Sequence, residues 1–371
     1  MKILLLSCST GEGHNHCALA VKEALEVRGH ETEFLDMLHM FGEPGPLSFD
    51  KVLNRISSKT PELFGMMYHA GAMYSATGVT SPVYLANIRH ARQLNDFIAE
   101  RGYDAVICSH LFPMETLTFL RRHERCTVRC YGVLSDYTCI PFLAETDLTG
   151  YFLPHEEIMS VCAEAGMPPE RLFVTGMPVA EKFKTAMTRR KAREGLGLPQ
   201  EKKIYPITTG GIGCGDAVSL CDAIRRVPDE NSLLCVLPGR NEELRAALET
   251  QYEGDGVMAV PFTDKVAEYM HACDVLLSKA GGISSSEAAV LGAPLVHTMA
   301  IPGVETLNAQ FFADHGMSYF AQNVDEAARF ADRLIYDSAA RDRMLAAQRA
   351  CLPRNGAERI AEHVEQENAD A

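Results

Sequence analysis

Long hydrophobic runs are missing from this chain of 371 residues. No stretch approaches the about 18 consecutive apolar residues that suggest a membrane-spanning helix, so we expect none. The opening run "KILLLSC" is too short for a secretory signal and passes directly into a glycine turn. We therefore expect a cytoplasmic protein.

Positive charge is also scarce. The net charge is −14, which argues against a general nucleic-acid-binding role because nucleic-acid phosphates would be repelled. Residues 51–101 differ, since six basic and three acidic side chains give them a local charge of +3 (6 − 3) among Met, Tyr and Phe residues. This stretch is either a weak, peripheral contact with anionic lipid on the inner face of the membrane or a helix pair covering a sheet.

The 12 cysteines lack the spacing of a zinc site. The closest pair, Cys126 and Cys130, falls inside an expected strand. Scattered cysteines in apolar runs suit a reducing compartment, where the free thiol behaves as a small hydrophobic group. We expect no metal and no bound cofactor.

Short apolar runs alternate with helical patterns throughout, which predicts an α/β protein with parallel sheets. The first helix is predicted over residues 18–28. The pattern restarts after the charged stretch "TRRKAREGLGLPQEKK", so two domains are predicted, residues 1–180 and 181–355. We expect two Rossmann-like domains facing each other across a central cleft, with a last helix, residues 356–371, packing back on the first domain.

Three glycine-rich turns follow expected strands: "STGEGH", "TTGGIGCG" and "SKAGGISSSE". Open α/β sheets bind ligands at such places, where helix N-termini favour anions. In the first turn Gly11 and Gly13 fit the dinucleotide motif G-x-G-x-x-G, but His16 holds the position of its third glycine. The match is partial, and an NAD-dependent oxidoreductase is disfavoured.

The third turn, "SKAGGISSSEAAVLGAP", predicts a nucleoside diphosphate. Gly281 and Gly282 allow the backbone close to a diphosphate, and the following serines add hydroxyl donors. Glu287 lies about one turn inside the helix, where its carboxylate can accept hydrogen bonds from a ribose diol.

Several motifs in a fixed order resemble one family. They are "STGEGHNHCALAV", "SDYT", "VTGMPV", "GGIGCG", "PFTDKVAEYM", "SKAGGISSSEAAVLGAP" and "IPGVETLN". They resemble the processive diacylglycerol glycosyltransferases and plant-type monogalactosyldiacylglycerol synthases, relatives of the MurG-type transferase, from Met1 to about Phe320. The resemblance implies a GT-B fold and an inverting, metal-independent transfer of glucose or galactose from a UDP-sugar to diacylglycerol. The N-terminal domain would bind the acceptor and the C-terminal domain the donor.

The resemblance also implies roles for single residues. Glu287 would contact the ribose, the backbone near Phe262 would hold uracil, and Glu305 and Asn308 would face the donor sugar. The remaining expected donor-side residues lie in glycine turns or directly after one: Gly210, Gly211, Gly281, Gly282, Ser284 and Ser285. Gly11 and Gly13 would lie on the acceptor side.

His14 would be the catalytic base, because an inverting transfer needs a group that takes the proton of the acceptor hydroxyl. Asp136, in "GVLSDYT", would orient the histidine or the acceptor. Simpler roles remain open for several of these residues. His14 could cap its helix, Asp136 could bind strand-end amides, and Asn308 could cap the helix that follows it. Glu287 could be a surface helix residue, and Glu305 a solvated loop acid.

Two departures from the family pattern bear on the substrates. Val304 stands where a sugar-contacting glutamine is usual, and Ile140 and Leu143 stand near the places of a His and a Trp. The alternatives are therefore another lipid or small-molecule acceptor, or a nucleotide-sugar binding protein without turnover.

Overall fold

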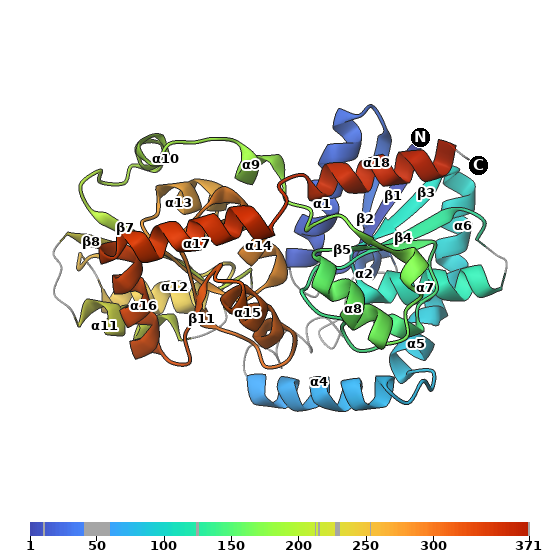
Figure 1. Ribbon diagram of the computed structural model, residues 1–371, viewed down its shortest axis with the longest axis horizontal. Helices are drawn as coiled ribbons and strands as arrows, with labels where there is room; N and C mark the ends of the chain where they lie inside the picture. Colours follow the sequence, from blue (N-terminus) through green and yellow to red (C-terminus); the bar gives the residue numbers. More distant parts are fainter. Residues whose placement is uncertain are drawn as a thin grey trace. The chain divides into compact units, whose positions relative to one another are not determined.

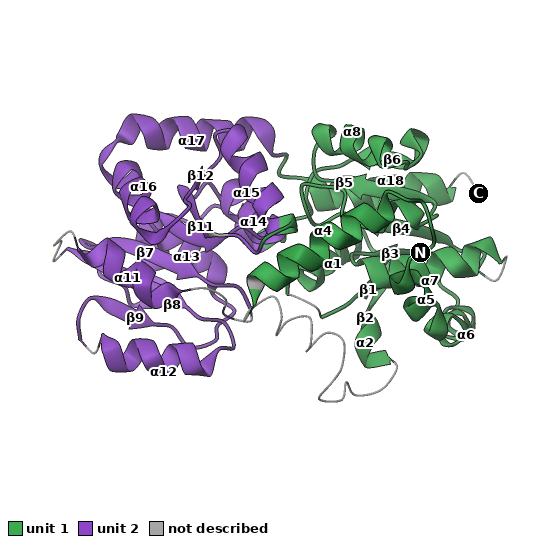
Figure 2. Ribbon diagram, turned by 90° about the horizontal axis from the view of Figure 1, so that it is seen from below, with its two compact units in different colours: residues 1–181, 302–304, 353–371 green, residues 182–301, 305–352 purple. Residues whose placement is uncertain are grey.

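The computed structural model describes residues 1–9, 12–40, 60–123, 126–211, 213, 216–226, 231–252 and 254–369. The chain forms two compact units (Figure 2). Unit 1 consists of Met1–Glu181, Pro302–Val304 and Pro353–Ala371, and unit 2 of Lys182–Ile301 and Glu305–Leu352.

Unit 1 contains a six-stranded parallel sheet with the strand order β2-β1-β3-β4-β5-β6. The strands are short apolar runs, as parallel strands buried on both faces require, and Ile3 to Leu6 in β1 are fully buried. The strands are β1 (Lys2–Ser7), β2 (Glu31–Asp36), β3 (Ala105–Cys108), β4 (Arg129–Val133), β5 (Gly150–Leu153) and β6 (Leu172–Val174).

Helices connect the successive strands, as expected for parallel neighbours, and a further helix from the end of the chain belongs to the same unit. They are α1 (Glu12–Val27), α2 (Met37–Met40), α4 (Pro61–Ser75), α5 (Pro82–Asn87), α6 (Ala91–Arg101), α7 (Leu111–Arg122), α8 (Glu156–Glu164) and α18 (Gly356–Ala369). Short 3₁₀ turns are η1 (Ile88–His90), η2 (Leu143–Glu145) and η3 (Pro169–Arg171).

The last helix, α18, belongs to unit 1 and lies against α1 (Figure 1). The Arg28 guanidinium, just after α1, donates from Nε to Glu365 at 2.9 Å, and His30 Nε2 lies 2.6 Å from the same carboxylate. Arg359 donates to the Thr175 carbonyl oxygen at 3.2 Å. The end of the chain is therefore tied to both early and late elements of unit 1.

Unit 2 contains a second six-stranded parallel sheet, ordered β12-β11-β10-β7-β8-β9. One cluster of its buried core joins β7, β8 and α13 through Ile204, Cys235 and Tyr269. The strands are β7 (Lys203–Thr208), β8 (Ser232–Leu237), β9 (Val257–Ala259), β10 (Leu276–Lys279), β11 (Leu295–Met299) and β12 (Tyr319–Phe320).

In unit 2, two helices precede β7 and the others follow the strands. They are α9 (Glu181–Lys184), at the boundary between the units, α10 (Arg189–Leu196), α11 (Ala217–Arg225), α12 (Glu242–Gln251), α13 (Val266–Ala272), α14 (Gly282–Leu291), α15 (Val304–Asp314), α16 (Val324–Tyr336) and α17 (Ser338–Cys351). Among the described residues, no helix is both long and apolar enough to cross a membrane.

Two helix starts differ from the sequence-based expectation. The first helix begins at Glu12 rather than Ala18, so His14 lies in its first turn. The helix α15 begins at Val304, so Asn308 lies inside it, and the expectation that Asn308 caps a helix is wrong.

Candidate active site

In each sheet the strand order changes direction at one place, where one strand has its successor on one side and a later strand on the other side. In unit 1, β1 lies between β2 and β3, and in unit 2, β7 lies between β8 and β10. Ligands of open parallel sheets bind at the carboxyl ends of the strands at such switch points. The three glycine turns follow β1, β7 and β10, so all three stand at these two positions.

His14 is half-buried in the first turn of α1. Its Nδ1 lies 2.9 Å from the backbone carbonyl oxygen of Ser109, directly after β3. Because a carbonyl oxygen only accepts hydrogen bonds, the neutral imidazole carries its proton on Nδ1 and its lone pair on Nε2. The ring is therefore held in the tautomer that a base acting through Nε2 needs.

Asp136 is connected to His14 through one hydroxyl group. The Ser135 Oγ lies 3.1 Å from His14 Nδ1 and 3.2 Å from Asp136 Oδ2. Since a carboxylate accepts, Ser135 donates to Asp136, and the Ser135 oxygen accepts from the histidine. The structure thus connects the two predicted catalytic residues through the Ser135 hydroxyl, and a carboxylate at this place would favour a protonated imidazole.

A second histidine, His110, packs against the first. The two rings meet edge to face with centroids 4.6 Å apart. His110 caps α7, its Nδ1 accepting from the Phe112 N–H at 3.1 Å, so its proton is on Nε2. Burial, and after it the nearby His14, lowers the pKa of His110 well below its usual value, so the ring is neutral.

A small cavity of about 20 Å³ opens beside these residues, which is room for a water-sized group. His14 and Asp136 lie at its wall, and much of the remaining lining is apolar. The apolar lining residues are Leu111, Met114, Val133, Leu134, Ile140 and Leu143. Ile140 and Leu143, two of the three residues that depart from the family pattern, therefore line the space next to the candidate base.

Two acceptor-side predictions fall partly on residues that the structure does not describe. Gly13 is half-buried in the first turn of α1, next to His14, whereas Gly11 lies outside the described residues. Residues 51–59 of the predicted lipid-contacting stretch also lie outside them.

In unit 2, α14 begins directly after the turn that follows β10. Gly281 is its N-cap and has no side chain that could cap the helix. The Ser285 N–H donates to the Gly281 carbonyl at 3.0 Å, so the amides of residues 282–284 precede this first helical bond. These amides and the positive end of the helix dipole suit an anion such as a diphosphate.

The serines of this turn do not all have the same surroundings. Ser284 is half-buried and donates to the Gly281 carbonyl at 3.2 Å. Ser285 is fully buried with its hydroxyl 2.9 Å from His297 Nε2, and Ser286 donates to the Gly282 carbonyl at 2.7 Å. The Ser285 hydroxyl therefore fastens α14 to β11, which leaves Ser284 as the more accessible hydroxyl.

The turn after β7 packs closely on the turn after β10. Gly210 has φ +78°, and a Cβ added there would stand 2.5 Å from Lys279 Cε. The adjoining Gly211 carbonyl accepts from the Arg240 N–H at 2.9 Å. Gly210 thus lies where only a bare backbone leaves room, and Gly211 is held by the hydrogen bond to Arg240.

Glu305 and Asn308 come from α15 and reach the same turn. The Glu305 carboxylate pairs with Lys279 and accepts from the Ile301 N–H at 3.1 Å. Asn308, fully buried, donates to the Ala280 carbonyl at 3.2 Å. Glu305 is 6% exposed, so it is not a solvated loop acid.

Glu287 and Phe262, assigned to ribose and uracil, differ in exposure. Glu287 is 4% exposed inside α14, so it is not a surface helix residue. Phe262 is 55% exposed, and the Arg240 guanidinium lies over its ring, 4.3 Å from the centroid. Through Arg240, the segment carrying Phe262 adjoins the turn of Gly211.

Sequence reasoning missed several side chains next to these sites: Ser135, His110, Lys279 and Arg240. Two of them lie inside a quoted motif, since Ser135 opens "SDYT" and Lys279 is the second residue of "SKAGGISSSEAAVLGAP". The motifs could therefore have drawn attention to these two side chains. His110 and Arg240 lie beside no predicted site residue along the chain, and only the fold brings them near.

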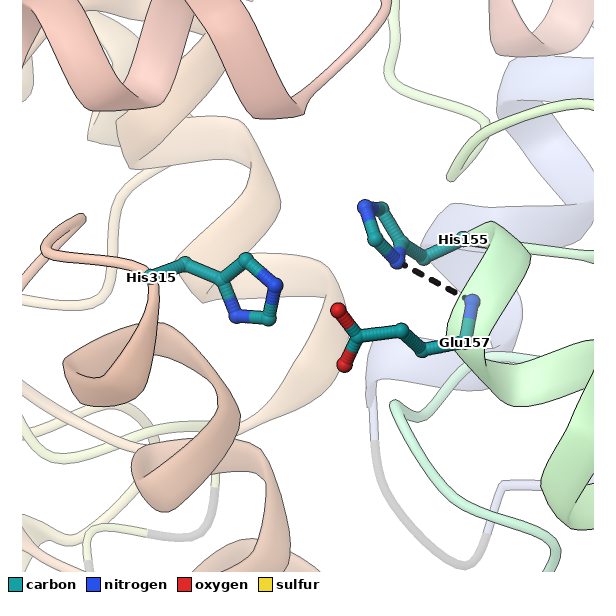
Figure 3. A group of neighbouring side chains, drawn as sticks. All are labelled: His155, Glu157 and His315. Atoms are coloured by element: carbon teal, nitrogen blue, oxygen red, sulfur yellow. Dashed lines mark hydrogen bonds between the residues drawn. The ribbon is translucent and has the colours of Figure 1, made fainter.

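Figure 3 shows three further side chains that carry metal-ligand atoms. In unit 1, His155 caps α8, and its Nδ1 accepts from the Glu157 N–H at 3.3 Å. In unit 2, His315 Nδ1 lies 2.8 Å from the Phe311 carbonyl oxygen one turn earlier. Each imidazole thus has a local structural role, and the two residues of unit 1 alone are too few for a zinc site.

Two protein-family models match the chain. Residues 14–179 match the family described as monogalactosyldiacylglycerol (MGDG) synthase. Residues 222–364 match the family described as glycosyltransferase family 28 C-terminal domain. The first match includes His14 and Asp136, and the second includes α14 and α15.

Two relatives that carry the same name each match most of the chain. A protein of Bacillus cytotoxicus named processive diacylglycerol beta-glucosyltransferase is 27% identical over 322 residues, which is 85% of this chain and 80% of the relative. A protein of the same name from Bacillus pumilus is 24% identical over 341 residues, covering 91% of this chain and 87% of the relative.

Solved structures share the fold. The MnaA–UDP co-structure from S. aureus aligns with a TM-score of 0.65 at 15% identity, covering 99% of this chain and 96% of that one. MurG of Acinetobacter baumannii aligns with a TM-score of 0.63 at 14% identity, covering 98% and 99%. With two six-stranded parallel sheets, the chain has the GT-B fold. It belongs to the monogalactosyldiacylglycerol synthase and glycosyltransferase 28 family.

Proposed function

We propose that this glycosyltransferase moves glucose or galactose from a UDP-sugar to diacylglycerol at a membrane surface, with inversion at the anomeric carbon. In this proposal residues 1–180 bind the acceptor and residues 181–355 bind the donor. The observation that carries it is the His14 imidazole, held by the Ser109 carbonyl with its lone pair on Nε2 beside an apolar cavity.

The acceptor step follows from the surroundings of His14. Its Nε2 takes the proton of the diacylglycerol hydroxyl as the oxygen bonds to the anomeric carbon. Asp136, acting through Ser135, stabilises the imidazolium that results. The apolar side chains next to the candidate base favour a lipid acceptor over a polyhydroxylated one.

The donor step involves the turn before α14. As the bond between the anomeric carbon and the β-phosphate oxygen breaks, its electron pair stays on UDP. The amides of residues 282–284 and the helix dipole stabilise this charge. Glu287 accepts hydrogen bonds from the ribose diol, the backbone near Phe262 holds uracil, and Glu305 and Asn308 face the sugar.

A membrane contact is proposed for α4 and its neighbours. The exposed apolar side chains of α4 share one helix face: Leu63, Met66, Met67, Met73 and Tyr74. On the inward side, Ser75 Oγ accepts from the Phe142 N–H at 3.0 Å, which fixes the helix on unit 1. Exposed Arg89 and Arg92 follow in η1 and α6 and suit anionic headgroups.

The test is a product assay with the purified full chain. UDP-glucose, UDP-galactose and UDP-N-acetylglucosamine are each offered with vesicles containing diacylglycerol, and lipids are analysed by mass spectrometry. We expect a hexosyl-diacylglycerol from one of the first two donors, with an anomeric configuration by NMR opposite to that of the donor. Because Val304 replaces the usual glutamine, the donor panel also decides the sugar.

Two outcomes would contradict the proposal. Product formed only from another lipid or a small molecule would replace diacylglycerol as the acceptor. Binding of UDP without product from any acceptor would leave nucleotide-sugar binding as the function.

A further inference from the structure

Lys279 occupies the switch point of the unit 2 sheet. It is the last residue of β10, the strand that neighbours β7, and it directly precedes the turn into α14. A Cβ added at Gly210 would stand 2.5 Å from Lys279 Cε, and one added at Gly281 would stand 3.9 Å from its Nζ. The lysine side chain therefore lies across both glycine turns, close to the amides that begin α14.

The ammonium group is held in a confined pair. The Lys279 side chain is 19% exposed and that of Glu305 is 8% exposed, and the two form an ion pair. The second oxygen of Glu305 accepts from the Ile301 N–H at 3.1 Å. A partly desolvated pair of this kind is sensitive to the loss or gain of a charged partner.

We propose that Lys279 binds the diphosphate of the donor nucleotide and exchanges Glu305 for a phosphate oxygen when the donor arrives. This inference rests on the proposed function. A diphosphate at the start of α14 lies within reach of Nζ, and it carries more negative charge than one carboxylate. Lysine is a compact cation that binds phosphate as a point charge.

The exchange gives Glu305 a second role. Once the ammonium turns to phosphate, the Glu305 oxygen that it leaves can accept a hydrogen bond from a hydroxyl of the donor sugar. The sugar contact then becomes available only after the diphosphate is bound. During transfer the ammonium neutralises charge that develops on the leaving UDP.

The test measures binding of UDP and of uridine by calorimetry. In Lys279→Met we expect UDP affinity to fall by about tenfold or more, with uridine affinity unchanged, because a charge-assisted contact to phosphate is lost. In Glu305→Gln we expect tighter UDP binding, because the competing carboxylate is gone, together with slower sugar transfer. Lys279→Arg keeps the charge and should retain most of the UDP affinity.

The matched control is Lys203→Met, which removes a positive charge at the amino end of β7 in the same unit. It should leave UDP affinity unchanged. Wild-type protein that fails to bind UDP overturns the proposed function itself. Wild-type binding with equal UDP affinity in Lys279→Met overturns the lysine assignment alone. Should Lys279→Met not fold, Glu305→Gln decides, since unchanged or weaker UDP binding in that variant overturns the exchange.

Discussion

His14 takes its orientation from backbone and side-chain partners that are distant in sequence. The Ser109 carbonyl and the Ser135 hydroxyl both face Nδ1, so the same nitrogen is shared between two acceptors. His110 packs edge-on against the ring and stays neutral because burial lowers its pKa. A neutral neighbour leaves His14 free of like-charge repulsion when it takes up a proton.

The first prediction follows from this arrangement. His14→Ala should lower the turnover number by about 10²-fold or more, because a positioned general base is lost, and should leave UDP affinity unchanged. Turnover is measured with the donor found in the product assay, and UDP affinity by calorimetry. His16→Ala is the matched control, since His16 is exposed two residues further along the same helix. Equal turnover in the two variants would exclude His14 as the base.

The sequence could indicate candidate side chains for the chemistry but not what holds them in place. "STGEGH" and "SKAGG" are local patterns, so His14 and the glycine turn before α14 could be predicted from them. The partner of His14 is the backbone oxygen of Ser109, 95 positions away, and every residue type has such an oxygen. Ser285 shows the same limit. Its motif suggests a hydroxyl that donates a hydrogen bond to phosphate, whereas the structure places this hydroxyl against His297.

At the scale of elements, helix starts were less predictable than strands. The buried face of α1 begins at Cys17 and Ala18, so its apolar periodicity could only indicate a start near there. The preceding helical residues 12–16 are half-buried or exposed and not apolar, so they add nothing to this periodicity. In α15 the buried residues include Glu305 and Asn308, polar side chains that a hydrophobic pattern does not count. Both helices begin with the residues assigned to chemistry.

The second prediction concerns α4 as an element. Met66 is 63% exposed and Met73 is 76% exposed on its outward face. The double variant Met66→Glu with Met73→Glu should lose binding to anionic vesicles and activity on vesicle-embedded diacylglycerol, because two charges replace apolar contacts with the lipid interface. Co-sedimentation measures the binding, and UDP affinity should be unchanged.

The matched control for α4 is Val27→Glu. Val27 is 84% exposed at the end of α1 in the same unit. The Val27→Glu variant therefore adds a negative charge at another exposed apolar position. It should sediment with vesicles like the wild type. Equal vesicle binding by the α4 variant and the wild type would remove α4 from the membrane contact.

At the scale of the whole molecule, the chain does not keep its two units in sequence. It leaves unit 1 near Glu181, builds unit 2 with a short return to unit 1 at Pro302–Val304, and returns to unit 1 from Pro353 onward. The sequence predicts a last helix over residues 356–371, and α18 is described over Gly356–Ala369. Glu365 of α18 pairs with Arg28 and His30, which are far away in the chain. The sequence contains many acidic residues and does not specify which of them pairs with these two side chains.

The last prediction tests how α18 is held. The Arg28 guanidinium, and after it His30, lowers the pKa of Glu365 from 4.5 to about 2. A carboxylate whose pKa is lower in the folded state stabilises the fold above pH 4.5 and loses this contribution as pH falls toward 2. Glu365→Gln should therefore lower the Tm by about 1–3 °C at neutral pH, since the pair is partly exposed, and this deficit should vanish as the pH approaches 2.

The control is Glu164→Gln, which changes an exposed acid on α8 and should show no such pH-dependent deficit. A Tm deficit of Glu365→Gln that is constant across this pH range would mean that its ion pair does not hold α18 on unit 1.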